Sequence, residues 1–115
     1  MSDATIDAAT FAELQESAGA DFVKELVQTF LEEAPAMLAE LREALAAGHA
    51  DAFRRAAHSL KSNSLTFGAG ALAALARDLE LSAGPVVRRE RPAALDVLAG
   101  EERRVRVALR ELAGG

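Results

Sequence analysis

The fold is decided by residues 21–47, which read DFVKELVQTFLEEAPAMLAELREALAA. Large apolar side chains recur in this stretch at spacings of three, four and seven residues: Phe22, Leu26, Phe30, Met37, Leu38, Leu41 and Leu45. This spacing places one apolar stripe along an α-helix and predicts a long helix from about residue 21 to residue 47. Pro35 is expected to bend this helix rather than end it, because the stripe resumes beyond the proline.

One helix is predicted before the long helix and another after it. A short helix at about residues 10–18 begins where Thr10 and Glu13 have the spacing of a capping box. Gly48 ends the long helix, and Asp51 is the expected N-cap of the next one, which breaks at Gly68. The expected core face of that helix consists of Phe53, Ala57, Leu60, Ser64 and Phe67.

Two more helices complete the prediction. One spans about residues 69–82, and Gly84-Pro85 is expected to stop it. Residues 86–91 follow as an expected surface connection. Within it, Arg88 to Arg91 has no assigned function: a solubilising loop is the simpler interpretation, and a bias in partner choice is the other. The last helix starts near Pro92, and Glu102 interrupts its apolar seam of Leu95, Leu98, Val105, Leu109 and Leu112.

Composition agrees with an all-α fold. The chain of 115 residues has 27 Ala and 16 Leu but seven Val, one Ile and no Tyr or Trp. Amphipathic helices joined by short turns pack as bundles. We therefore predict one domain over residues 1–115. It is an antiparallel up-down-up-down four-helix bundle over about 21–113, with an additional short N-terminal helix.

Charge and residue usage exclude several classes of function. The net charge of −5 argues against binding to nucleic acid. The chain has no cysteine, and His49 and His58 lie nine residues apart, so we expect no metal site and no bound cofactor. There is neither a secretory signal nor an apolar run long enough for a membrane span, which favours a cytoplasmic protein.

The third helix carries the one pattern that helix formation and core packing do not explain. At 100° per residue, His58 points about 140° away from the centre of the core face, which places the imidazole in solvent. Within about 60° of it lie Arg54, Arg55, Lys61, Ser62 and Leu65. An imidazole is nucleophilic without losing a proton, and neighbouring cations would attract a phosphoryl group. The pattern suggests that His58 is phosphorylated.

Residues 58–64, HSLKSNS, followed by Phe67-Gly68-Ala69, resemble the signature of the histidine phosphotransfer (HPt) domain family. Residues 30–35 and 51–57 extend the resemblance on the N-terminal side. It implies a phosphocarrier that is not itself an enzyme. His58 would accept a phosphoryl group from a receiver-domain aspartate and pass it to another receiver aspartate, with Mg²⁺ held by the receiver.

The resemblance and the helical face around His58 together suggest the supporting residues. Lys61 matches a family lysine near the phosphoryl group, and Arg54 and Arg55 are weaker candidates for the same support. Ser62, at a position that is most often glycine in the family, and Leu65 would form the docking surface for receiver domains of response regulators or hybrid kinases. A stand-alone monomeric carrier is expected.

Two other functions stay open at this point. One is a helical interaction module in which His58 is incidental and the basic face docks an acidic partner. The other is a histidine kinase dimerisation domain, although Ser59-Leu60-Lys61 follows His58 where those domains have an acidic residue, and no nucleotide-binding segment is present.

Overall fold

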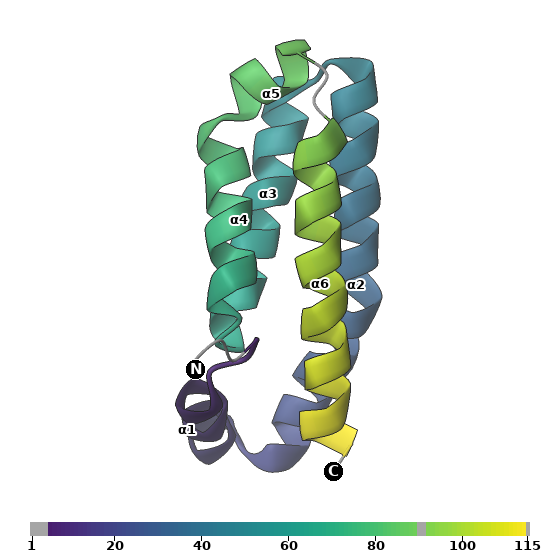
Figure 1. Ribbon diagram of the computed structural model, residues 1–115. Coiled ribbons are helices and arrows are strands. Elements are labelled where there is room, and N and C mark those ends of the chain that lie inside the picture. The colour runs from purple at the N-terminus through teal and green to yellow at the C-terminus, as the bar shows by residue number, and fades with distance from the viewer. Residues whose placement is uncertain (1–4, 90–91, 115) are drawn as a thin grey trace.

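The computed structural model describes residues 5–89 and 92–114, and these form helices joined by short turns. The helices are α1 (Ala8–Ala18), α2 (Ala20–Ala47), α3 (Ala50–Thr66), α4 (Gly70–Leu81), α5 (Ala83–Arg89) and α6 (Pro92–Gly114). The four long helices α2, α3, α4 and α6 run alternately up and down, as Figure 1 shows. The predicted all-α, antiparallel four-helix bundle with a short N-terminal helix is thus confirmed.

The core lies along the bundle axis and draws on every helix. Its largest fully buried side chains include Leu41, Phe53, Leu60, Leu72, Leu95, Leu98 and Leu109. The predicted core face of α3 is buried throughout, including the hydroxyl residue Ser64, whose Oγ donates to the carbonyl of Leu60 at 2.6 Å. Phe30 on α2 meets Phe67 edge to face, with ring centroids 5.5 Å apart. This contact ties α2 to the end of α3.

The start of α2 is rotated relative to the prediction. Phe22 is 51% exposed, and Val23 and Val27 are buried where Phe22 and Leu26 were expected. The buried positions then continue through Ala34 to Leu45 at spacings of three and four residues. The error arose because a larger apolar side chain stands beside each valine, so two helical phases fit the pattern. The helix continues through Pro35, as predicted.

Two helix starts differ from the capping predictions. Asp7, rather than Thr10, caps α1, because its carboxylate accepts from the backbone N–H of Thr10 at 3.0 Å. The hydrogen bonds from the Thr10 side chain and backbone hold the pKa of Asp7 below its usual range. His49, rather than Asp51, is the N-cap of α3, and Asp51 instead pairs with Arg54 in the first turn.

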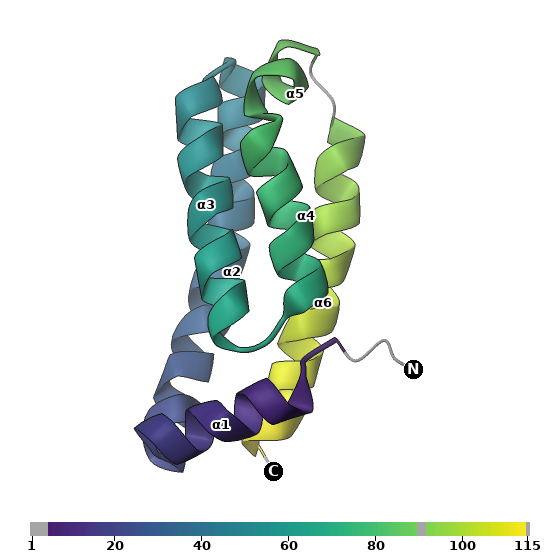
Figure 2. The same cartoon turned by 90° about the vertical axis from the view of Figure 1, so that its left-hand side faces the viewer.

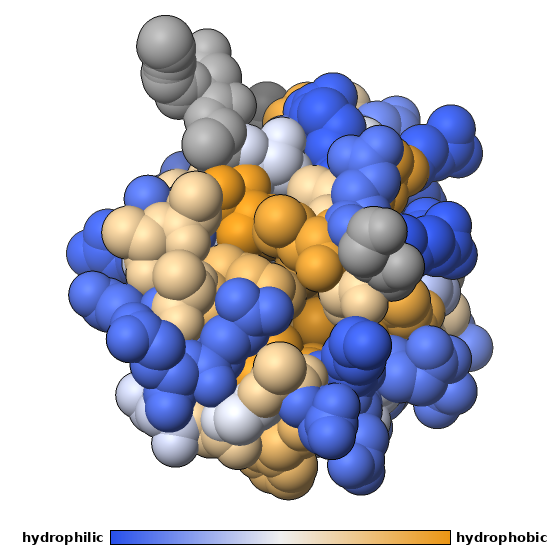
Figure 3. All heavy atoms as spheres, turned by 90° about the horizontal axis from the view of Figure 1, so that it is seen from below, coloured by the Kyte–Doolittle hydropathy of each residue, from blue (hydrophilic) through white to orange (hydrophobic). Residues whose placement is uncertain are grey.

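The turn after α3 holds the N-terminal segment. Gly68 has φ 78°, and its carbonyl accepts from the N–H of Asp7 at 2.9 Å. A Cβ at Gly68 would lie 2.9 Å from the Cβ of Thr10, so only glycine fits here. The N-terminal segment and α1 thereby close the lower end of the bundle (Figure 2). Seen from below, apolar side chains gather in the middle of this end, surrounded by hydrophilic ones (Figure 3).

Residues 83–89 form helix α5 instead of the expected surface connection. Pro85 is the third residue of α5, where the missing N–H costs no helical hydrogen bond, so Gly84-Pro85 does not stop the chain from turning helical again. The buried side chains of α5 are those of Ala83, Val86 and Val87, and their burial stabilises this short helix. Arg88 and Arg89 are exposed in its last turn, and the rest of the predicted basic connection, residues 90–91, lies outside the described residues.

Helix α6 follows the predicted seam with two differences. Leu112 is 43% exposed rather than buried. Glu102, expected to interrupt the seam, is instead fully buried, with its Oε2 2.6 Å from Nε of Arg106. The residue one turn along the helix thus supplies the counter-charge for a carboxylate inside the bundle. None of the described helices is both long and apolar enough to cross a membrane.

Candidate functional site

His58 projects from the middle of α3 on the side opposite the core. Its side chain is 56% exposed, whereas Ala57 and Leu60 beside it are fully buried. The helical phase that buries Phe53, Ala57 and Leu60 is therefore the phase that presents the imidazole to solvent. The prediction that His58 faces solvent is confirmed.

A carboxylate from the neighbouring helix holds this imidazole. Nδ1 of His58 lies 2.9 Å from Oε2 of Glu80 on α4. The other oxygen, Oε1, lies 3.0 Å from Nζ of Lys61 on α3. Helices α3 and α4 are antiparallel and lie side by side (Figure 2). Their packing brings Glu80 into contact with His58. Glu80 thus connects His58 and Lys61 into one network.

The charges in this network favour one form of the imidazole. The hydrogen bond from Lys61, and then that from His58, hold the pKa of Glu80 below its usual range, against a smaller opposing effect of burial. Glu80 is therefore ionised at neutral pH and can only accept hydrogen bonds. Because Nδ1 of His58 contacts this acceptor, the contact favours the neutral tautomer with its proton on Nδ1, in which the electron pair of Nε2 is free. The exposed ring thus presents a nucleophilic nitrogen to solvent.

The three cations predicted around His58 separate in the structure. Lys61 joins the network through Glu80. Arg54 instead pairs with Asp51 at 2.6 Å on the exposed side of the first turn. Arg55 faces the gap between α2 and α3. Of the three, Lys61 is the one that the structure links to His58, because both contact the carboxylate of Glu80.

The predicted docking residues lie on the surface beyond His58. Ser62 is exposed one turn further along α3, and Leu65 is 56% exposed two turns further. The backbone at Ser62 is held in the helix and also accepts a hydrogen bond from the hydroxyl of Thr66 at 3.2 Å. A small residue followed by an unpartnered leucine leaves an open path to the imidazole along α3.

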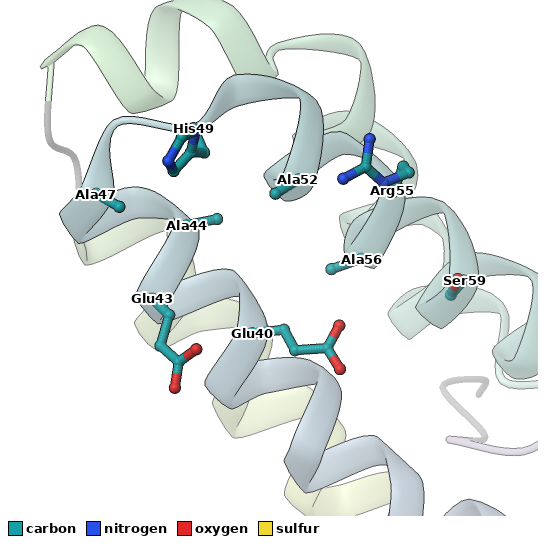
Figure 4. A pocket seen from close by; sticks show the side chains of 9 residues that line it. All are labelled: Glu40, Glu43, Ala44, Ala47, His49, Ala52, Arg55, Ala56 and Ser59. Carbon is teal, nitrogen blue, oxygen red and sulfur yellow. The ribbon is translucent and has the colours of Figure 1, made fainter.

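A groove of about 380 Å³ runs between α2 and α3 beside this surface (Figure 4). Small side chains line its floor: Ala44, Ala47, Ala52 and Ala56. Glu40 and Glu43 come from α2, while Arg55 and Ser59 come from α3. His49 lies at the end of the groove near the α2–α3 turn. Ser59, which lines the groove, directly follows His58 in the chain.

Sequence reasoning missed Glu80. Its contact with His58 spans 22 residues of chain and depends on the register of two packed helices. The one signal available was a carboxylate on the flank of α4, next to the buried Leu79, and such a residue is typical of any solvated helix. Within the described ranges, no three acidic or histidine side chains gather in a way that could hold a metal ion.

Comparisons with known proteins identify a family and a similar structure. The model of the Hpt domain family matches residues 25–114. The crystal structure of histidine-containing phosphotransfer protein B (HptB) from Pseudomonas aeruginosa PAO1 is similar, with a TM-score of 0.88 and 34% sequence identity. The similarity covers 98% of this chain and 97% of that one. No curated protein matches the chain.

Proposed function

Because the chain belongs to the Hpt domain family, we propose that it is a histidine phosphocarrier of a phosphorelay and that His58 carries the phosphoryl group. The observation that supports this assignment is the exposed imidazole whose Nδ1 is engaged by Glu80, which leaves Nε2 free. The second histidine, His49, caps α3 and has no such partner among the described residues. His58 is thus the histidine prepared for nucleophilic attack.

The proposed reaction is a reversible transfer between His58 and an aspartyl phosphate. The electron pair on Nε2 attacks phosphorus, the N–P bond forms, and the P–O bond to the aspartate breaks, with its electrons returning to the carboxylate. The reverse reaction delivers the phosphoryl group to a second aspartate. Both aspartates, and the Mg²⁺ that balances the phosphoryl charge, would belong to receiver domains. This chain therefore acts as a carrier rather than as a classical enzyme.

Lys61 is the proposed electrostatic support for the transferred group. It lies three positions along α3 from His58, on the same face, and its ammonium is already held beside the imidazole by Glu80. A phosphoryl group on Nε2 would bring about two negative charges next to this cation. Arg54 and Arg55 lie further from the network, and their proposed contribution is a general positive potential over the start of α3.

We propose that the receiver docks over His58 along α3, on the surface formed by Ser62 and Leu65. The donor and acceptor atoms must come nearly into line, so the two backbones must approach closely, and Ser62 adds little bulk. Leu65 supplies apolar area for the contact. The α2–α3 groove beside it offers an acidic wall of Glu40 and Glu43 to the same partner.

The test is phosphoryl transfer from a receiver domain carrying labelled phosphate. The wild-type chain should take up label that is labile in acid and stable in base, as expected of a phosphoramidate. His58→Gln should keep its helical circular dichroism and take up none. His49→Gln is the matched control and should be labelled like the wild type. Label that persists on His58→Gln, or that is lost from His49→Gln, would refute the assignment.

A further inference from the structure

We propose that the carboxylate of Glu80 keeps a proton on Nδ1 of phosphorylated His58, so that the imidazole leaves as a neutral ring when the phosphoryl group moves on. This inference rests on the proposed phosphorylation of His58. It assigns to Glu80 the role of a positioning residue, because it acts on the reacting nitrogen through the ring and does not touch the phosphoryl group.

This proton is needed because the electrons of the broken N–P bond stay on the imidazole ring. When the N–P bond of the phosphorylated Nε2 breaks, the bonding pair stays on Nε2. If Nδ1 carries a proton, the leaving group is neutral imidazole. If Nδ1 has lost its proton, the leaving group is an imidazolate anion, which is a far stronger base and a poorer leaving group. Transfer to the receiver therefore depends on the protonation of the nitrogen that faces Glu80.

The geometry suits Glu80 for this task. Oε2 is 2.9 Å from Nδ1, within the range of a charge-assisted hydrogen bond. The Glu80 side chain is only 19% exposed, so water competes weakly for the same oxygen. Lys61 occupies the other oxygen at 3.0 Å and keeps the carboxylate ionised and fixed in place. The three side chains form a chain of contacts from ammonium to carboxylate to imidazole.

Other charged groups near this part of α3 do not make the same contact. Helices α2, α4 and α5 all pack against α3. Other ionisable side chains on α3 and on the helices packed against it include Glu40, Glu43, Arg54, Arg55, Arg77, Asp78, Arg88 and Arg89. Among the described residues, Glu80 is the one ionisable group with a measured contact to the His58 ring. Its charge should therefore dominate the proton affinity of Nδ1.

The consequence is a pH dependence of transfer. An imidazole without a charged partner titrates near pH 6.5, and an adjacent carboxylate favours the protonated ring. Glu80 should thus extend efficient transfer to higher pH. In Glu80→Gln the side chain still offers an oxygen to Nδ1 but no charge, so the proton should be lost at lower pH.

The experiment measures transfer from purified phosphorylated protein to an unphosphorylated receiver between pH 6 and pH 9. The fall in rate with rising pH should begin at least about one unit earlier in Glu80→Gln than in the wild type, a tenfold slower transfer on the falling limb. Asp78→Asn removes one exposed charge from the same helix, without touching the network, and should leave the profile unchanged.

A second measurement is independent of the receiver. The ¹⁵N chemical shift of Nδ1 in the phosphorylated protein reports the proton directly, and its titration should move to lower pH in Glu80→Gln. Coincident profiles and titrations for Glu80→Gln and the wild type would overturn the role of Glu80 while leaving the phosphorylation of His58 intact. If Glu80→Gln does not fold, a wild-type Nδ1 titration no higher than that of phosphorylated N-acetylhistidine overturns it equally. Absence of label from wild-type His58 would instead refute the proposed function.

Discussion

Two glutamates in this bundle each lie beside a cation, yet their pKa values are shifted in opposite directions. Glu80, at the α3–α4 surface, lies between Lys61 and His58, and these partners lower its pKa. Glu102, inside the bundle on α6, lies 2.6 Å from Arg106, yet burial raises its pKa and the arginine only partly offsets this. The nearby cation therefore does not decide the direction of the pKa shift. Access to water decides it, because a fully buried carboxylate loses solvation that one ion pair does not replace.

The same contrast separates function from stability. The surface around Glu80 leaves its charged groups ready to interact with a partner, whereas Glu102 is buried and paired with Arg106 of its own helix. We therefore expect substitutions at the first region to change phosphoryl transfer with little change in stability. Substitutions at the second should do the reverse.

The largest expected effect is that of bulk beside His58. Ser62→Trp should reduce both receiver binding and phosphoryl transfer by about a hundredfold or more, because the indole fills the approach to the imidazole. Circular dichroism should still show a folded helical bundle, since Ser62 is exposed. Normal transfer by this variant would mean that the partner approaches from another side, and the functional region would have to be drawn elsewhere.

A smaller effect is expected for Lys61→Ala. Single-turnover transfer from a phosphorylated receiver should slow by about tenfold, because one charged contact to the phosphoryl group is lost. Arg77→Ala, which removes an exposed cation from α4, serves as the control and should transfer normally. Equal rates for Lys61→Ala and the wild type would remove Lys61 from the functional region.

Truncation of the exposed leucine should be weaker still. Leu65→Ala should weaken receiver binding by about 1 kcal/mol, or roughly fivefold, because it removes an apolar anchor from a small and transient contact. Binding can be followed by calorimetry with an unphosphorylated receiver. Val97, which is 59% exposed on α6, supplies the control: Val97→Ala should bind as the wild type does.

The smallest effect concerns Glu102 and its pairing with Arg106, the second member of the comparison between the two glutamates. The raised pKa of Glu102 means that the folded state binds this proton more tightly than the unfolded state. Its contribution to stability is therefore full at low pH and declines as pH rises from the ordinary carboxyl pKa of 4.5 through the raised value.

Glu102→Gln should remove this decline and raise the free energy of unfolding at pH 7 by about 1 kcal/mol, with unchanged transfer. Arg106 tolerates the loss because its side chain is 26% exposed and can reach water. Urea unfolding at pH 4.5 and pH 7 measures the difference. A decline with pH that is as steep in Glu102→Gln as in the wild type would show that another group causes it.

The sequence predicted features that depend on a single helix and missed those that depend on two. The core face of α3 and the exposure of His58 follow from periodicity alone. The contact with Glu80 requires the register between α3 and α4, which no local pattern encodes. Phe22 was misplaced because two helical phases fit equally well, and α5 was missed because Gly84-Pro85 is typical of a stop as well as of a helix start.

The hydrogen bond between Asp7 and Gly68 bears on how this domain can be transplanted. The family match begins at residue 25, but Ile6, Phe11 and Val23 are buried in the same core as the rest of the bundle. A fragment that begins at residue 25 would lack all three side chains. It would also lack Asp7, whose N–H donates to the carbonyl of Gly68 in the α3–α4 turn. A portable version of the phosphocarrier must therefore begin no later than residue 5.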